Sequence, residues 1–337
     1  MPDGGIARQA LEVEDLTVRF RRRHGEVAAV NGVSFSLARG ETLTILGESG
    51  SGKSVSLKAL MRLLPDYAVT GGSVRLAAQD LLAMPAASFA KLRGGAIAMI
   101  FQEPMTAFDP VYTIGRQISE TIVQHEGVDH RSARHRVLKL LERVQIPSAA
   151  RRLDNYPHEL SGGMRQRAMI ALALACSPAV LLADEPTTAL DVSVQIQILV
   201  LLRQLQQELG MAIVFVTHDI GAAAEISDRI AVMYAGRFVE AATVRDIIRS
   251  PRHPYTQGLL ASTPHGGLRG RRLEVIPGTP PDLAALPDGC SFAPRCPHAS
   301  ESCRAGEVPA VRLQAGGMVR CIRVTEAVNS RGQEVGI

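Results

Sequence analysis

One motif constrains this chain more than any other. Residues 47–54 read GESGSGKS and match the phosphate-binding loop pattern G-x-x-x-x-G-K-[ST] in full. The preceding segment, 41–46 (ETLTIL), is typical of a buried strand, and 55–64 (VSLKALMRLL) is typical of a helix, which is the order the motif requires. Backbone N–H groups of such a loop surround phosphates, and the helix N-terminus adds a favourable dipole. We therefore predict that a nucleoside triphosphate is bound by Gly47, Glu48, Ser49, Gly50, Ser51, Gly52, Lys53 and Ser54.

Two residues of this loop have specific predicted tasks. Lys53 can reach the β- and γ-phosphates of a bound nucleotide, and the hydroxyl of Ser54 can hold Mg²⁺. A chance glycine-rich turn is the competing interpretation. The flanking strand and helix pattern disfavours it.

An acidic pair later in the chain indicates that the bound nucleotide is hydrolysed. Asp184 and Glu185 follow the apolar run 179–183 (AVLLA). At a strand end, one carboxylate can face Mg²⁺ and the other can orient the water that attacks the γ-phosphate. A solvated acidic turn is the alternative, and a phosphate loop earlier in the chain makes it less favoured. We predict Asp184 as a Mg²⁺ ligand and Glu185 as a catalytic residue.

Strand and helix patterns alternate through the chain, which predicts an α/β fold with a parallel core. A helical pattern covers about 113–176, where Ile114, Ile118 and Ile122 recur at four-residue steps. A further helix is predicted at 192–209. The strand-like segments are 11–20, 33–37, 97–101, 180–183, 212–217 and 230–234.

Composition sets the outer bounds. The chain has 337 residues, of which 46% are apolar, so it can bury a sizeable core in one large or two modest domains. The formal net charge of +4 is small and the basic runs at 21–24 and 269–272 are short, so we expect no nucleic-acid partner. No signal pattern or unbroken membrane-spanning run is present, and a cytosolic globular class is expected.

The composition changes near Ser250. Prolines become frequent beyond this point, and four of the five cysteines lie there. We therefore predict two domains: a nucleotide-binding domain at 1–250 and a small Pro- and Cys-rich C-terminal extension at 251–337.

A third motif indicates the family. Residues 160–167 read LSGGMRQR, and together with GESGSGKS, LLADEP, Gln102 and His218 they closely resemble the ATP-binding-cassette (ABC) ATPases. The resemblance implies an ABC-type P-loop nucleotide-binding domain: a RecA-like core, an antiparallel β subdomain and a helical subdomain at about 103–176. It also implies that two cassettes face each other head to tail, each ATP lying between one phosphate loop and the opposite signature. Ser161, Gly162 and Gly163 would then act on the partner's nucleotide.

Further positions carry over from the same resemblance. Gln102 would contact Mg²⁺ and the attacking water, and His218 would touch the γ-phosphate. Residues 189–191 (Ala-Leu-Asp), with Asp191 at their end, would communicate across the dimer. Phe20 would stack on adenine, although Phe35 and Phe101 are also available.

Other segments resemble the oligopeptide and dipeptide importer branch of the ABC ATPases. They are 101–110 (FQEPMTAFDP), 253–256 (HPYT), 276–281 (IPGTPP) and 289–299 (GCSFAPRCPHA). The resemblance implies an ATP-hydrolysing subunit that powers peptide uptake. One departure is Ala107-Phe108-Asp109, where many members have Ser-Leu-Asn. Nickel complexes and glutathione are alternative cargoes, because other subunits choose the cargo.

The cysteines of the extension suggest a metal site, since disulfides are rare in cytosolic proteins. Their spacing fits neither the usual zinc pairs nor the common ferredoxin runs. By resemblance to some importers of this branch, a [4Fe–4S] cluster is the favoured prediction, with zinc, for which His298 is a possible ligand, and reduced thiols as alternatives. The predicted ligands are Cys290, Cys296, Cys303 and Cys321, whereas Cys176 is expected to be a small core residue.

The resemblance also implies partners and a location. We expect a homologous cassette in a heterodimer, two transmembrane permease subunits and, indirectly, an extracytoplasmic substrate-binding protein. The chain would lie peripherally on the cytoplasmic face of the inner membrane. A soluble ABC ATPase regulated by metal or redox state is the rival function. Repair and chromosome-organising ATPases are disfavoured, because long coiled-coil arms separate their phosphate loop and signature.

Overall fold

The computed structural model describes residues 9–22, 25–188, 190–263, 275–313 and 317–329. The chain divides into two compact units. The first unit comprises Met1–Glu12, Ser36–Thr42 and Val74–Phe215, and the second comprises Val13–Phe35, Leu43–Ser73 and Val216–Ile337.

Buried parallel strands form the core of the first unit. Strand β6 (Ile97–Ile100) pairs in parallel with β7 (Val180–Asp184), with Ile97 opposite Val180 and Ile100 opposite Ala183. Strand β8 (Ala212–Thr217) is the next neighbour of β7. All residues of these strands are buried, as expected for a parallel sheet that is covered on both faces. The predicted parallel α/β core is thus confirmed.

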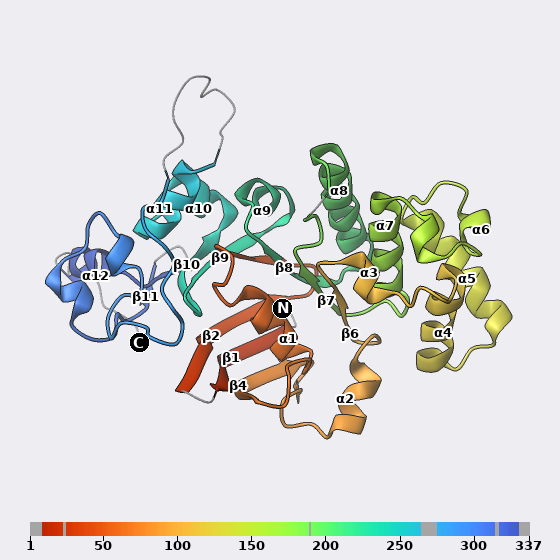
Figure 1. The fold of residues 1–337 in the computed structure, drawn as a ribbon, viewed down its shortest axis with the longest axis horizontal. Helices are drawn as coiled ribbons and strands as arrows, with labels where there is room; N and C mark the ends of the chain where they lie inside the picture. The colour runs from red at the N-terminus through yellow and green to blue at the C-terminus, as the bar shows by residue number, and fades with distance from the viewer. Residues whose placement is uncertain (1–8, 23–24, 189, 264–274, 314–316, 330–337) are drawn as a thin grey trace, which may run out of the picture. The chain divides into compact units, whose positions relative to one another are not determined.

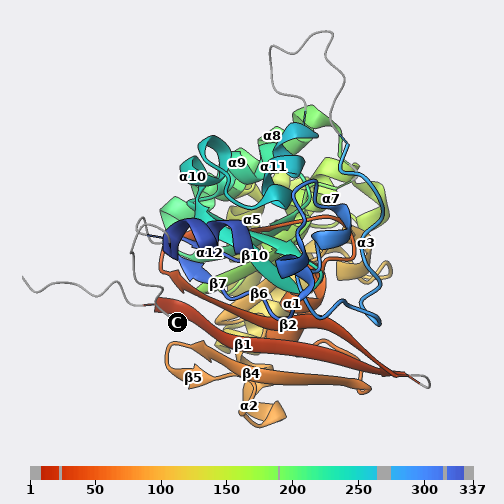
Figure 2. The ribbon, with the colours of Figure 1, turned by 90° about the vertical axis from the view of Figure 1, so that its left-hand side faces the viewer.

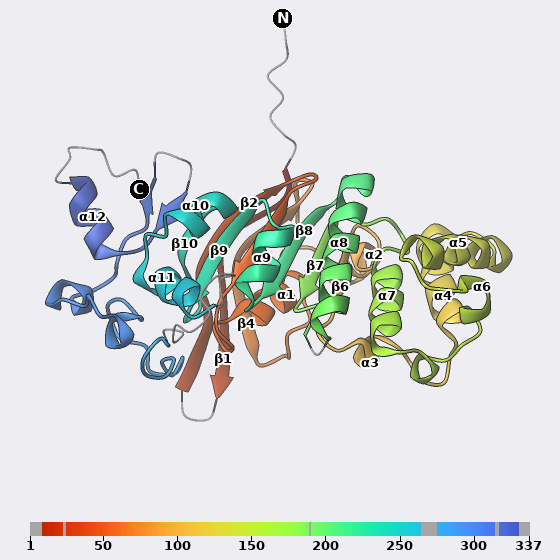
Figure 3. The same ribbon diagram turned by 90° about the horizontal axis from the view of Figure 1, so that it is seen from above.

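The predicted helical region contains a group of helices (Figures 1 and 3). Helix α4 (Ile114–Glu126) buries Ile114, Ile118 and Ile122, so the four-residue periodicity marks its packed face. The other helices of the first unit are α2 (Ala86–Leu92), α3 (Pro104–Ala107), α5 (His130–Arg143), α6 (Ala149–Arg152), α7 (Gly162–Ala173) and α8 (Val192–Leu209).

Sheet strands of the second unit carry the phosphate loop at one strand end. Strand β3 (Thr42–Leu46) pairs in parallel with β9 (Arg229–Tyr234), and β9 pairs antiparallel with β10 (Arg237–Thr243). Ala235 and Gly236 join β9 to β10 with φ of 47° and 79°, as a two-residue type I′ hairpin turn requires. Strand β12 (Met318–Val319) continues the sheet beside β10, and β11 (Val311–Arg312) follows.

A separate antiparallel sheet has the strand order β2-β1-β4-β5, visible in Figure 2. Its members are β1 (Gln9–Arg22), β2 (Gly25–Ala38), β4 (Ala68–Leu76) and β5 (Gln79–Asp80). The sequence pattern predicted β1 and part of β2 only.

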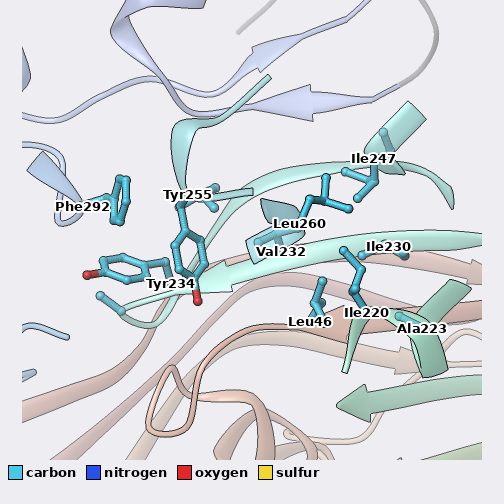
Figure 4. Close-up of a cluster of buried hydrophobic side chains, with 13 residues drawn as sticks. Leu46, Ile220, Ala223, Ile230, Val232, Tyr234, Ile247, Tyr255, Leu260 and Phe292 are labelled. Carbon is cyan, nitrogen blue, oxygen red and sulfur yellow. The ribbon is translucent and has the colours of Figure 1, made fainter. Parts of the chain in front are cut away.

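Helices and turns beyond Thr243 belong to the second unit, which also contains an apolar cluster. They include α10 (Val244–Arg249), α11 (Pro254–Ala261), α12 (Ile322–Asn329) and short 3₁₀ turns at Ala293–Arg295 and Glu301–Arg304. Tyr234, Tyr255 and Phe292 lie together in this cluster (Figure 4). Ring centroids of Tyr234 and Tyr255 are 4.5 Å apart. The proposed boundary near Ser250 stays a prediction.

Within the described ranges, no helix is long and apolar enough to cross a membrane.

Candidate functional site

The phosphate loop lies between β3 and α1 (Lys53–Leu60) of the second unit. Gly52 precedes the helix with φ of 106°, and no side chain caps the first turn. A Cβ atom on Gly47 would collide with the carbonyl oxygen of Met233, and one on Gly52 with that of Ala29. Only glycine therefore permits this close passage of the loop.

Lys53 is buried at the base of the loop. Its Nζ donates to the carbonyl oxygens of Gly47 at 2.7 Å and Glu48 at 2.9 Å. These bonds place the ammonium group inside the curve of the loop. The backbone N–H of Gly236 donates to the carbonyl oxygen of Ser51 at 2.8 Å, so the β9–β10 turn also holds the loop.

The loop fits a bound triphosphate. The hydroxyl of Ser51 is buried without a hydrogen-bond partner among the residues that the structure describes. Ser49 and Gly50 are exposed, and Ser54 is half-buried at the start of α1. An uncapped helix start, a buried ammonium and an unsatisfied hydroxyl are all suited to phosphate oxygens.

The acidic pair lies in the first unit, at the carboxyl end of β7. Asp184 is the last residue of the strand and is buried. Glu185 follows with φ of 45°, a backbone conformation uncommon for a residue other than glycine, and its Oε2 accepts from the hydroxyl of Thr188 at 2.9 Å. Gln102 is exposed just beyond β6. Because β6 and β7 are parallel neighbours, Gln102 and the acidic pair emerge at the same edge of the sheet.

The signature segment begins helix α7. Ser161 is the N-cap, and its Oγ accepts from the N–H of Met164 at 3.4 Å. Gly162 and Gly163 form the first turn. A Cβ on Gly163 would lie 3.0 Å from Cγ1 of Val194 in α8, so the signature turn lies against the start of that helix.

Asp191 caps α8, with Oδ1 accepting from the N–H of Val194 at 3.0 Å. Leu190 and Asp191 are described, whereas Ala189 lies outside the described residues. The first unit therefore brings the signature turn and the segment after Glu185 close together.

His218 and Phe20 belong to the second unit. His218 is exposed immediately after β8. Phe20 is half-buried on β1, and its ring centroid lies 5.9 Å from that of Tyr67, which is exposed. The sequence did not predict that Tyr67 lies beside Phe20, because strand β4, which follows Tyr67, was not predicted next to β1.

The predicted metal cluster in the extension is wrong. Among the described residues, no group of three or more His, Cys, Asp or Glu side chains is placed to hold a metal ion. Cys290, Cys296, Cys303 and Cys321 do line one cavity, but its volume is only ≈ 20 Å³, room for about one water molecule. A four-iron cluster does not fit a cavity of this size, and none of the described groups of side chains is placed to hold zinc.

The cysteines of the extension fit the alternative prediction, in which they are reduced thiols without a metal. Burial raises the pKa of Cys290, Cys296 and Cys321, which favours the neutral thiol. Cys176 is half-buried, and burial raises its thiol pKa too. The four cysteines of the extension are free thiols that are half-buried or buried.

Residues from the extension reach the phosphate loop, which sequence reasoning did not predict. The guanidinium of Arg295 forms two bonds with the carboxylate of Glu48, and the hydroxyl of Tyr255 accepts from the N–H of Glu48. The signal in the sequence was the pair of segments 253–256 (HPYT) and 289–299 (GCSFAPRCPHA), which contain Tyr255 and Arg295. It marked family membership without indicating this contact.

Comparison with known proteins places the chain in a family. A family model described as "ABC transporter" matches residues 30–188, and one described as "Oligopeptide/dipeptide transporter, C-terminal region" matches residues 239–303. The oligopeptide transport ATP-binding protein OppD of Salmonella typhimurium is 46% identical over 316 residues, covering 94% of each chain. The chain belongs to the ABC transporter family, in the oligopeptide/dipeptide branch. The dipeptide transport ATP-binding protein DppD of Bacillus subtilis is 48% identical over 297 residues, which cover 88% of this chain and 89% of DppD.

Solved structures of ABC cassettes share the fold. A dimeric form of the cassette MJ0796, bound to ADP and Pi, has a TM-score of 0.63 and 28% identity, covering 70% of this chain and 99% of that one. The cassette cbiO1 from Clostridium perfringens has a TM-score of 0.61 and 27% identity, covering 72% of this chain and 92% of its own. The predicted ABC cassette fold is confirmed.

Proposed function

We propose that this ABC family member is the ATP-hydrolysing subunit of a peptide importer. The observation that carries the proposal is a complete phosphate loop with a buried Lys53, in a chain related over 94% of its length to an oligopeptide transport ATP-binding protein. Hydrolysis in the cassette powers uptake of di- or oligopeptides. Residues 1–250 supply the ATPase, and 251–337 form the extension.

Each residue of the nucleotide site has a separate role. The loop amides and Lys53 hold the phosphates, and the Phe20 ring supports adenine. Ser54, Gln102 and Asp184 would hold Mg²⁺, which would neutralise charge on the phosphates. Glu185 orients the attacking water and takes its proton, while His218 contacts the γ-phosphate.

A second cassette completes the site. The signature residues of one cassette contact the nucleotide held by the loop of the other; they are Ser161, Gly162 and Gly163. Asp191 communicates closure of the site across the dimer. The amides at the start of α7 suit this task, because a helix N-terminus attracts anions. The dimeric state of the cassette MJ0796 supports the arrangement. A homologous ATPase subunit is the proposed partner.

Peptide uptake also needs a path across the membrane. Two permease subunits supply it, with an extracytoplasmic substrate-binding protein delivering the peptide. The chain lies on the cytoplasmic face of the inner membrane, bound to the permeases through residues near Gln102.

Transport by the reconstituted assembly tests this function. The chain is co-expressed with its partner cassette and permeases, and vesicles are assayed for ATP-dependent accumulation of labelled peptide. We expect uptake with the parent chain and none with Lys53→Ala. If the assembly accumulated a nickel complex or glutathione and ignored peptides, the peptide proposal would be refuted while the ATPase assignment stood.

A further inference from the structure

A buried arginine of the extension holds the second residue of the phosphate loop. Arg295 is 6% exposed, and its Nη1 and Nη2 lie 2.7 Å and 3.0 Å from the two carboxylate oxygens of Glu48. Its Nε donates to the carbonyl oxygen of Pro277 at 2.8 Å. Nη1 also lies 3.3 Å from the hydroxyl of Tyr234. The guanidinium is therefore fixed by the extension on one side and by the loop on the other.

Glu48 is held at its three polar groups. Its N–H donates to the hydroxyl of Tyr255 at 3.0 Å, its carboxylate binds Arg295, and its carbonyl accepts from Nζ of Lys53 at 2.9 Å. Lys53 is the residue proposed to face the β- and γ-phosphates. One loop residue thus links that lysine to the extension.

The two extension residues are themselves rigidly placed. Tyr255 is fully buried, and its ring lies 4.5 Å from Tyr234 and 5.3 Å from Phe292 between centroids (Figure 4). Its N–H donates to Nδ1 of His253 at 3.0 Å, and the N–H of His253 donates to the buried carboxylate of Glu240 at 2.9 Å. Hydrogen bonds therefore run from β10 through α11 to the loop.

The pair of Arg295 and Glu48 differs from a surface ion pair in its geometry and its burial. A bidentate arginine–carboxylate pair with a buried guanidinium is geometrically specific, and removing one partner leaves a buried charge uncompensated. In the fold, the Arg295 side chain is 5% exposed and that of Glu48 is 28% exposed. The loop and the extension consequently depend on each other for their conformation.

We propose that Arg295 and Tyr255 are positioning residues for the nucleotide site, which hold Glu48 so that the phosphate loop and Lys53 are preorganised for ATP. The inference rests on the proposed function, because it assigns a role toward the nucleotide of that site. Both residues lie within the matched C-terminal region, 239–303. The extension therefore sets the nucleotide affinity of the cassette.

Nucleotide binding by the full chain tests the inference. MgATP affinity is measured by calorimetry, with folding checked by circular dichroism, for Arg295→Gln, Arg295→Lys, Glu48→Gln and Tyr255→Phe. We expect Arg295→Gln to raise Kd about tenfold, within the usual range of coupling between sites, and Arg295→Lys to recover part of the loss. The double variant Glu48→Gln/Arg295→Gln should bind about as weakly as either single variant, because both remove the same contact.

Tyr255→Phe is the milder variant, since it removes the hydroxyl and keeps the ring packing. We expect a smaller rise in Kd from it. Glu307→Gln is the matched control: it removes a carboxylate of the extension that pairs with Arg237 of β10, and it should leave Kd unchanged. In the assembled transporter, the Arg295 variants should raise KM for ATP more than they lower kcat.

Two results would overturn the inference. One is a folded Arg295→Gln chain that binds MgATP with the parent Kd. If that variant does not fold, parent-like Kd values for both Arg295→Lys and Tyr255→Phe would overturn it instead. A parent chain that binds no MgATP would refute the proposed function itself, so the two failures are distinguishable.

Discussion

Lys53 is the residue on which the nucleotide site depends most. Its buried ammonium is held by two loop carbonyls, in a position to meet phosphate oxygens. Lys53→Ala should weaken ATP binding roughly 10- to 100-fold, because charge-assisted hydrogen bonds contribute about 1.5–3 kcal/mol. Lys58→Ala, an exposed lysine on the same helix, is the control for equilibrium binding measurements. Equal affinities of both variants would contradict the assignment.

His253 gives the extension a pH dependence. Burial lowers its pKa from 6.5 to about 4, so the unfolded chain binds this proton at a higher pH than the folded chain does. The free energy of unfolding therefore falls as pH falls from 6.5 toward 4, by about 2 kcal/mol between pH 7 and pH 5 from this group alone. Buried Glu240, whose pKa is raised, contributes in the opposite direction.

Comparison with His253→Asn isolates the contribution of His253 to the pH dependence of the free energy of unfolding. Asparagine can still accept from the N–H of Tyr255, but it does not titrate. Denaturant unfolding at both pH values should show that the parent loses about 2 kcal/mol more than the variant on acidification. Parallel losses in the two proteins would show that His253 is not the titrating group.

At the scale of elements, helix caps fix the functional turns. Asp191 caps α8, and Asp191→Ala should lower the free energy of unfolding by about 1 kcal/mol through loss of the cap. Asp191→Asn keeps an acceptor and should stay close to the parent. Urea unfolding at neutral pH measures both, and an equal loss in the two variants would assign the effect to charge instead of capping.

Elements with strong local signals were predictable from the sequence. Helix α8 and strand β8 have their predicted bounds, because long apolar periodicity and a complete buried run mark them. Strand β4 (AVTGGSVRL) and the two-residue strands β11 and β12 were missed. Strand β4 pairs with β1 and strand β12 with β10, both distant in sequence, and β11 only adds to β12, so pairing partners more than local sequence make these segments strands.

The site shows the same division. The phosphate loop, the acidic pair and the signature were predicted because each motif is continuous in sequence. The contact of Arg295 with Glu48 joins residues 247 positions apart, and no local pattern in either segment predicts it. Four cysteines close in sequence suggested a metal, but the fold uses them as packed thiols.

At the scale of the whole molecule, the proposed pairing of cassettes predicts ATP-dependent assembly. Mixed with its partner cassette, Glu185→Gln should retain ATP and accumulate as a pair of cassettes in size-exclusion chromatography with light scattering, since bound nucleotide joins the two. Adding Ser161→Arg should block pairing, because a long charged side chain would enter the shared site. A mixture of Glu185→Gln and the partner cassette that forms no larger species with ATP would contradict the proposed pairing.

The most direct test of the ATPase account is turnover by the assembled transporter carrying Glu185→Gln. The carboxylate that deprotonates the attacking water is lost while the phosphate loop is untouched, so kcat should fall by about two orders of magnitude or more with ATP binding preserved. Hydrolysis at the parent rate, with ATP still bound, would contradict the assignment of Glu185 and the catalytic account built on it.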